Sequence, residues 1–96
     1  MSPAATETLR AFYVENRQQL YTYALSFTRQ REAAEDAIHQ AFQRLLRQEE
    51  LVDDLRPYVF RCVRNAAFDG LRRLAARRNA AENVIAGTGD SRKGVE

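Results

Sequence analysis

The sequence predicts an all-α fold, a compact bundle of three to four helices in one small domain. Strong helix formers (Ala, Leu, Arg, Glu and Gln) dominate the 96 residues, whereas glycine occurs four times and proline twice. Apolar residues also recur at intervals of three and four along most of the chain, which is the helical repeat. A chain of this length can bury only a modest core, so packed helices are the economical arrangement.

The first helical segment is expected over residues 4–28. Its apolar positions follow the helical repeat: Leu9, Phe12, Tyr13, Leu20, Tyr23, Ala24 and Phe27. The polar stretch from Glu15 to Gln19 interrupts them and predicts a break between two shorter helices. The polar residues 29–31 then form a joint to the next segment.

The second segment, residues 32–47, shows the clearest amphipathic pattern. One stripe is apolar and consists of Ala34, Ala37, Ile38, Ala41, Phe42, Leu45 and Leu46. The opposite side carries Asp36, His39, Gln40, Gln43 and Arg47. Residues 48–54 are polar and acidic and are expected to form a loop.

The last helix is expected from Leu55 to about Ala81, with Pro57 in the first turn, where its missing N–H costs nothing. Core positions are predicted at Leu55, Val59, Cys62, Val63, Ala66 and Leu74. Gly70 lies inside this helix at a cost of about 1 kcal/mol relative to alanine, which predicts a close helix crossing there. We therefore expect a helical domain over residues 1–82 and a flexible tail, or the start of an interdomain linker, over residues 83–96.

The small net charge of +2 conceals a strong asymmetry. The segment from Glu32 to Asp54 contains seven acidic residues and only two arginines. The segment from Arg56 to Arg78 contains seven arginines, no lysine and a single acid, Asp69. Arginine suits flat, bidentate contacts to phosphates and base edges, so the basic end predicts a polyanionic partner, with an ordinary solvated helix face as the alternative.

Two helical faces carry candidate functional residues. On the last helix, Arg61, Arg64, Asn65, Phe68 and Arg72 share one side at spacings of three, four and seven, with Arg73 beside them and Tyr58 upstream. This mixture of cations, an aromatic ring and an amide is suited to a phosphate backbone and to bases. On the middle helix, Asp36, His39, Gln40 and Gln43 form a hydrogen-bonding ridge suited to docking on another protein. Packing of the aromatic rings into the core, and simple solvation of the ridge, are the alternative interpretations.

An enzyme is not predicted. His39 is the only histidine, no second ligand is placed to share a metal with it, and there is no glycine-rich phosphate loop. Cys62 cannot form an internal disulfide and is expected to pack as a small apolar residue. With no apolar stretch near the roughly 20 residues of a membrane span and no signal-peptide pattern, we expect a cytoplasmic protein without cofactors.

Three stretches resemble a known family. Residues 34–42, AEDAIHQAF, look like the signature A-E-D-L-V-Q-E-x-F of extracytoplasmic-function (ECF) RNA polymerase sigma factors. Residues 58–73 resemble their signature W-L-Y-R-I-A-R-N-x-A-I-D-x-L-R-R, and residues 20–28 are similar to the helix that precedes both. Their order and separation agree as well, and the resemblance covers roughly residues 9–78.

The resemblance implies a function for the matching positions. In that family the domain, called region 2, docks on the clamp-helix coiled coil of the polymerase's largest subunit, here through Asp36, His39, Gln40 and Gln43. It captures a base of the non-template strand of the promoter −10 element at the loop before Tyr58. Asn65, with Arg61, Arg64 and Phe68, would contact that element, and Arg72 and Arg73 would hold its phosphates. An anti-sigma factor is a further partner that the resemblance implies. The family normally carries a second domain that reads the −35 element: either that domain follows the linker, which the glycine-containing tail favours, or the natural protein is a lone domain.

The chain departs from the family pattern at three places. The usual Gln-Glu pair is His39-Gln40, the usual tryptophan is Tyr58, and the loop of residues 48–54 is rich in acids. These acids would repel a DNA strand, which leaves open a second hypothesis: a sigma-like module that binds polymerase or a regulator without DNA. A helix-turn-helix protein for double-stranded DNA is less favoured, because no short turn joins two helices of suitable length.

Overall fold

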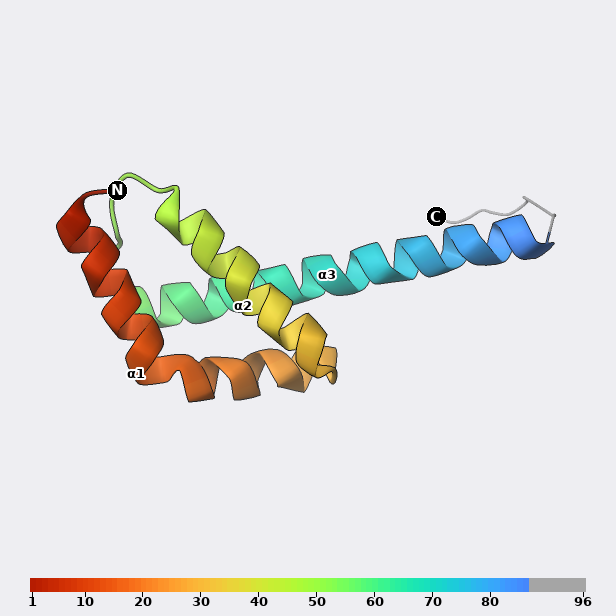
Figure 1. Cartoon of the computed structure of the whole chain (residues 1–96), viewed down its shortest axis with the longest axis horizontal. Coiled ribbons are helices and arrows are strands. Elements are labelled where there is room, and N and C mark those ends of the chain that lie inside the picture. The colour runs from red at the N-terminus through yellow and green to blue at the C-terminus, as the bar shows by residue number, and fades with distance from the viewer. Residues whose placement is uncertain (87–96) are drawn as a thin grey trace.

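The computed structural model describes the backbone of residues 1–86 and the side chains of residues 1–80. Within this part of the chain the fold is all-α and consists of three helices, α1 (Pro3–Thr28), α2 (Arg31–Leu46) and α3 (Leu55–Ala86). Each helix contacts the other two. Figure 1 shows α2 crossing α3, and the distal part of α3 projecting beyond the other two helices. The predicted all-α bundle is confirmed.

Helix α1 is a single helix that turns sharply near its middle, where the sequence predicted a break (Figure 1). Asn16, at the centre of the polar stretch, donates from Nδ2 to the carbonyl oxygen of Phe12, 2.9 Å away. A side chain that takes part in the backbone hydrogen-bond ladder is a recognised cause of helix bending. The polar stretch therefore bends the helix instead of ending it.

Arg56, in the first turn of α3, binds this middle part of α1. Its Nη1 donates to Asn16 Oδ1 and its Nη2 donates to Gln19 Oε1, each at 2.6 Å. Its guanidinium also lies over the ring of Phe60, 5.1 Å from the centroid. One side chain thus connects the middle of α1 to the start of α3.

The joint between α1 and α2 is a tight turn. The Thr28 hydroxyl, which is buried, donates to the carbonyl of Gln30 at 3.1 Å. Arg29 adopts a left-handed conformation (φ 59°), and its N–H bonds the Leu25 carbonyl at 2.8 Å, which closes the C-terminus of α1. From this turn α2 runs back over α3, which it crosses (Figure 1).

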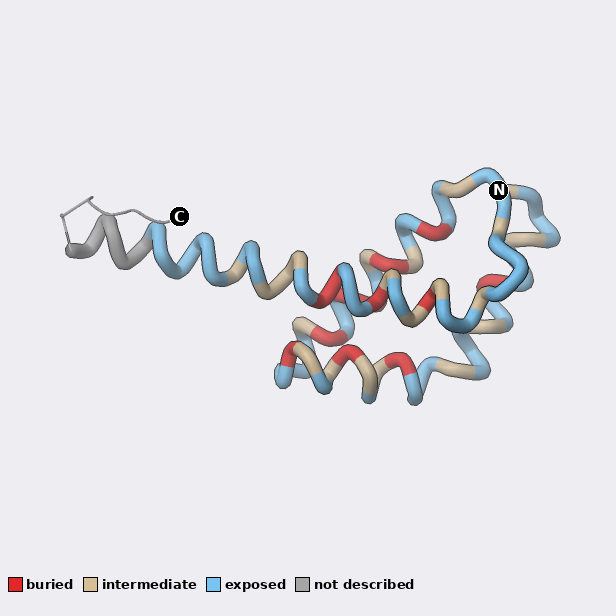
Figure 2. Tube along the Cα trace, turned by 180° about the vertical axis from the view of Figure 1, so that it is seen from behind, coloured by how far each residue is buried: buried red, intermediate tan, exposed pale blue. Residues whose placement is uncertain are grey.

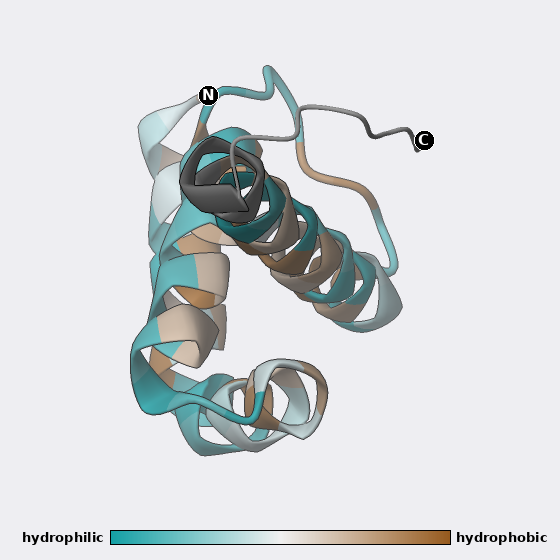
Figure 3. Cartoon of the chain, turned by 90° about the vertical axis from the view of Figure 1, so that its right-hand side faces the viewer, coloured by the Kyte–Doolittle hydropathy of each residue, from teal (hydrophilic) through white to brown (hydrophobic). Residues whose placement is uncertain are grey.

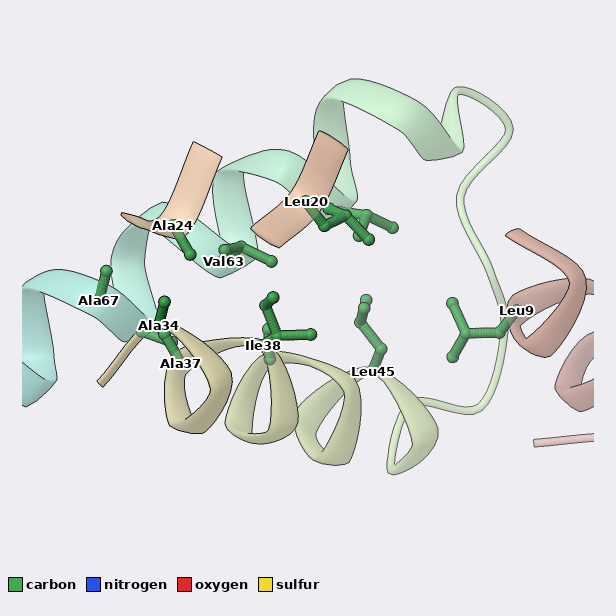
Figure 4. Packing of buried hydrophobic residues seen from close by; sticks show 12 residues of the cluster. Leu9, Leu20, Ala24, Ala34, Ala37, Ile38, Leu45, Val63 and Ala67 are labelled. Carbon is green, nitrogen blue, oxygen red and sulfur yellow. The ribbon is translucent and has the colours of Figure 1, made fainter. Parts of the chain in front are cut away.

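The core lies where the three helices meet, and Figure 4 shows the side chains that fill it. Leu20 and Ala24 come from α1, Ala34, Ile38 and Leu45 from α2, and Val63 and Ala67 from α3. Leu9, from the first half of α1, points toward Leu45 (Figure 4). Brown and teal positions alternate along the helices in Figure 3, as expected for helices that each bury one side.

The core of α3 differs slightly from the expected one. Val59, Val63 and Ala66 are buried as predicted, and so is Ala67, whereas Leu55, Cys62 and Leu74 are half-buried. Residues 75–80 are exposed, and Figure 2 shows this stretch in pale blue along the projecting part of α3.

Two expectations about α3 need correction. The helix continues to Ala86, past the expected end near Ala81, so residues 83–86 of the expected tail are helical; residues 87–96 lie outside the described residues. The close helix crossing predicted at Gly70 is wrong. A Cβ atom at this position would meet only the side chain of Arg73, at 3.8 Å, which is ordinary contact.

Candidate functional site

The ridge predicted on the middle helix lies on the outside of α2. We call Asp36, His39, Gln40 and Gln43 the α2 ridge. Asp36, His39 and Gln43 are exposed and Gln40 is half-buried. Gln40 Nε2 donates to Asp36 Oδ2 at 3.0 Å, which fixes the two side chains along one line of the helix. The ridge presents hydrogen-bonding groups of both kinds with little positive charge, an arrangement suited to a protein partner.

The predicted face of the last helix also lies on the outside. We call Arg61, Arg64, Asn65, Phe68 and Arg72 the α3 face; all five are exposed, as is Arg73 beside them. They face outward because Val59, Val63, Ala66 and Ala67 occupy the buried side of the same turns. The α3 face therefore combines exposed cations with an amide and a ring on one accessible surface.

The aromatic residues near the α3 face form a packed row. Phe60 contacts Tyr23, Tyr23 contacts Phe27, and Phe27 contacts Phe68, each edge to face with centroids 5.0–5.2 Å apart. Such pairs contribute about 0.5–1.5 kcal/mol beyond their area burial. Phe68 ends the row and keeps 39 % of its surface exposed. Its ring thus packs against α1 while part of it stays accessible to solvent.

Tyr58 is half-buried and tied to the loop that precedes it. Its hydroxyl accepts a hydrogen bond of 2.5 Å from Nε2 of Gln48. The bond joins the start of the loop of residues 48–54 to the beginning of α3. The four acids of this loop (Glu49, Glu50, Asp53 and Asp54) are all exposed. Tyr58 is accordingly less available for stacking than Phe68, and the core-packing alternative holds for it in part.

Sequence analysis missed the cluster that joins α2 to the α3 face. Asp69 is bound by Arg72, one turn away on α3, and by Arg44 of α2, whose Nη2 lies 3.4 Å from Asp69 Oδ2. Arg44 had no role in the sequence-based prediction, because its partner lies 25 residues away in the chain. Asp69 thereby brings a cation of α2 to the edge of the α3 face.

Cys62 lies beside this cluster and is half-buried. Burial raises the pKa of its thiol, and the nearby Arg44 and Arg61 guanidinium groups offset only part of that rise. The thiol is therefore protonated at neutral pH, which agrees with a packing role and not with a nucleophile.

The described residues contain neither a metal-binding group nor a membrane-spanning helix. No group of three or more His, Cys, Asp or Glu side chains in that part of the chain is arranged to hold a metal ion. Nor does any helix in the searched part have the length and apolar content needed to cross a bilayer.

With both surfaces placed, comparison with known families identifies the domain. The family model for sigma-70 region 2 matches residues 12–78, which include the α2 ridge and the α3 face. The chain belongs to the sigma-70 region 2 family. This family is a non-enzymatic domain of transcription initiation factors, which in general binds RNA polymerase and promoter DNA. Comparisons with curated proteins and with solved structures gave no significant match.

Proposed function

We propose that this chain is region 2 of an ECF-type sigma factor and that its two surfaces bind two different partners. The α2 ridge docks on the clamp-helix coiled coil of the largest polymerase subunit. The α3 face binds the non-template strand of the −10 element once the duplex has opened. The observation that carries the proposal is the outward placement of both residue sets on separate helices of one small bundle.

The chemistry of the α3 face supports binding of a single strand. Arg61, Arg64 and Arg72 are exposed cations that neutralise phosphates and release counterions. Asn65 lies between them and carries both a donor and an acceptor for a base edge. Phe68 adds an accessible ring, and stacking of an unpaired base on such a ring is worth about 1–3 kcal/mol.

Melting of the promoter duplex follows if the α3 face prefers unpaired bases to paired ones. A face that binds bases in the single strand stabilises the opened state and not the duplex, so binding shifts the equilibrium toward opening. A base that is already poorly stacked is the least costly to extrude, which couples recognition of the −10 element to its melting. Arg72 and Arg73 hold the backbone of the same strand.

The acidic loop favours a second candidate, in which the domain binds polymerase or a regulator without DNA. Glu49, Glu50, Asp53 and Asp54 are exposed close to Tyr58, and like charges repel an approaching phosphate backbone. Base capture at this loop is therefore the weakest part of the DNA-binding proposal, whereas the α3 face does not depend on it. An anti-sigma factor is the kind of regulator that either candidate accommodates.

A titration at low salt tests the proposal. Fluorescently labelled single-stranded oligonucleotides with the −10 sequence of either strand are mixed with the whole chain, and anisotropy is recorded with and without core polymerase. We expect binding that weakens with salt, with a log–log slope of about −0.7 for each phosphate contact, and a preference for the non-template strand. Polymerase binding without any oligonucleotide binding at low salt would favour the second candidate, and failure to bind polymerase would refute the proposal.

A further inference from the structure

Phe68 differs from its neighbours on the α3 face because it is a large apolar side chain left exposed among arginines. Among the described side chains of α3, no other large apolar residue is as exposed as Phe68, at 39 %. The sigma-factor signature has isoleucine at this position, so the ring is a feature of this chain and not of the signature. What the ring can bind depends on how firmly its surroundings hold it.

Phe68 is the open end of the aromatic row. The row starts at Phe60 on α3, passes through Tyr23 and Phe27 on α1, and returns to α3 at Phe68. Its two ends lie eight residues apart on one helix, which corresponds to about 12 Å, and its middle lies on another helix. At the first end the guanidinium of Arg56 covers the ring of Phe60. The three rings before Phe68 are half-buried, so only its end of the row is exposed.

The contact with Phe27 limits how the Phe68 ring can move. A ring on the outer side of a helix, without neighbours, samples more than one rotamer. Phe27 lies edge to face with Phe68, with centroids 5.1 Å apart, and such a pair favours one arrangement by about two- to tenfold. Tyr23, one turn earlier on α1, packs against Phe27 in the same way, with centroids 5.0 Å apart. The neighbour of Phe68 is therefore itself held in place.

The part of α1 that carries Phe27 is fixed at both of its ends. At one end, Arg56 of α3 donates to the side chains of Asn16 and Gln19, each at 2.6 Å. At the other end, Thr28 directly follows Phe27 and is buried. The second half of α1 thus forms a firm support beside α3, and Phe27 is the residue through which this support contacts Phe68.

We propose that Phe27 is a positioning residue for DNA binding, which holds the Phe68 ring where an unpaired base stacks on it. Phe27 does not touch the strand and acts through Phe68 alone. A ring that is already ordered before the strand arrives loses less freedom on binding, so stacking on it is more favourable. The inference rests on the proposed function of the α3 face, and it adds to that face a residue from a different helix.

Two single strands separate base stacking from phosphate contacts. One is the non-template −10 strand, and the other is an abasic strand of the same length, which offers only phosphates and sugars. In anisotropy titrations of the whole chain at low salt, Phe27→Leu should weaken binding of the −10 strand by about two- to tenfold. Affinity for the abasic strand and the log–log salt slope should not change. An equal loss on both strands, or no loss on either, would overturn the inference.

A matched control removes the same kind of ring pair elsewhere. Tyr13 of α1 contacts Phe42 of α2 edge to face, with centroids 5.3 Å apart, and neither residue belongs to the aromatic row. Tyr13→Leu should leave binding of both strands unchanged, and Phe27→Tyr, which keeps a ring, should bind the −10 strand like the parent chain. A loss in either of these variants as large as that in Phe27→Leu would contradict the inference.

A fluorescent ring at position 68 provides a readout that a change in stability alone does not alter. The chain contains no tryptophan, so Phe68→Trp introduces a single one, whose emission is quenched when a base stacks on it. At saturating −10 strand, quenching should be strong in this variant and clearly weaker once Phe27→Leu is added. Equal quenching at saturation would overturn the positioning role. If Phe27→Leu does not fold, Phe27→Met takes its place with the same two outcomes.

A double substitution separates this inference from the proposed function. In a Phe68→Leu chain, adding Phe27→Leu should cause no further loss of affinity for the −10 strand, because the ring that Phe27 positions is gone. Equal losses with and without Phe68 would show that Phe27 acts independently of it, and the inference would fail while the α3 face stands. A parent chain that does not bind the −10 strand at low salt would instead refute DNA binding itself, and the inference with it.

Discussion

The α2 ridge and the α3 face occupy helices of one bundle but differ in the kind of side chain that they expose. The ridge holds an acid, two amides and an imidazole, with Asp36 and Gln40 already bonded to each other. The face holds three arginines, an amide and a ring that is supported from below by Phe27. The same helical scaffold therefore offers one surface for hydrogen bonds to a protein and another for a polyanion with exposed bases.

The boundary between the two surfaces is the cluster around Asp69. Arg44 belongs to α2 and Arg72 to the α3 face, yet both bind this one carboxylate. The surfaces are thus chemically distinct but physically joined, and substitutions on each side test how independent they are.

Reversing the charge of Asp36 should give the largest effect. Asp36→Arg places a cation on the ridge, and like-charge or unpaired contacts in an interface cost several kcal/mol, so polymerase affinity should fall by at least about thirtyfold. Binding of single-stranded DNA should not weaken. Because Asp36 is exposed, the thermal unfolding midpoint should hardly change. Glu15→Arg, an exposed reversal on α1, is the control, and an equal loss in both variants would remove the ridge from the proposal.

Removing the amide of Asn65 should affect sequence preference more than overall affinity. A good amide–base pair contributes about 1–3 kcal/mol of discrimination. In the Asn65→Ala chain, the difference in binding free energy between the −10 strand and a scrambled strand should therefore fall by that amount, and the ratio of the two affinities should fall accordingly. Asn79→Ala, exposed on the projecting part of α3, should leave the ratio unchanged. An unchanged ratio in Asn65→Ala as well would place base recognition elsewhere.

Neutralising single arginines should weaken all single strands alike. Arg61→Gln and Arg72→Gln should each reduce the magnitude of the log–log salt slope by about 0.7, the contribution of one phosphate contact. Arg31→Gln, exposed at the start of α2, should leave the slope unchanged. If the salt slopes of these three variants do not differ, the α3 face does not bind the phosphate backbone of the DNA strand.

Replacing Asp69 should have a smaller effect of opposite sign. Asp69→Asn keeps the size of the side chain, removes the acid between Arg44 and Arg72, and should raise the affinity for any single strand by about threefold at low salt. The gain should disappear in high salt. A loss of affinity would show instead that Asp69 orients Arg72 for phosphate binding.

The smallest effect is expected at Gly70, which should change stability and neither surface. A methyl group there meets only the flexible side chain of Arg73, so Gly70→Ala should stabilise α3 by about 0.5–1 kcal/mol. Denaturant unfolding measures the change, with polymerase and DNA binding as controls. Destabilisation would mean that α3 packs more tightly at this position than the structure indicates.

Local patterns were sufficient to predict most of the fold and both surfaces. The apolar stripe of α2 and the buried side of α3 follow the helical repeat, which also fixes the residues on the opposite side of each helix. The exposure of Arg61, Asn65 and Asp36 followed from this repeat alone. The partners proposed for the two surfaces rest on side-chain chemistry and on the resemblance to sigma factors, not on the repeat.

The features that were missed depend on residues far apart in the sequence. The Arg56–Asn16 hydrogen bond joins residues 40 apart in the sequence, and the Arg44–Asp69 pair joins residues 25 apart, so no local pattern could reveal either contact. The prediction at Gly70 was wrong because a local pattern was given too much weight. A glycine in a helix often marks a close crossing, but here its half-buried site has room for a side chain.

Mapping both ligands on one labelled sample tests the two-surface account most directly. Amide chemical shifts of the ¹⁵N-labelled chain are followed during separate titrations with a −10 single strand and with a peptide of the polymerase clamp-helix coiled coil. We expect the strand to shift amides around Arg61, Asn65 and Phe68, and the coiled coil to shift those around Asp36, Gln40 and Gln43. Shifts by both ligands on the same helix, or a strand that perturbs only α2, would contradict the account.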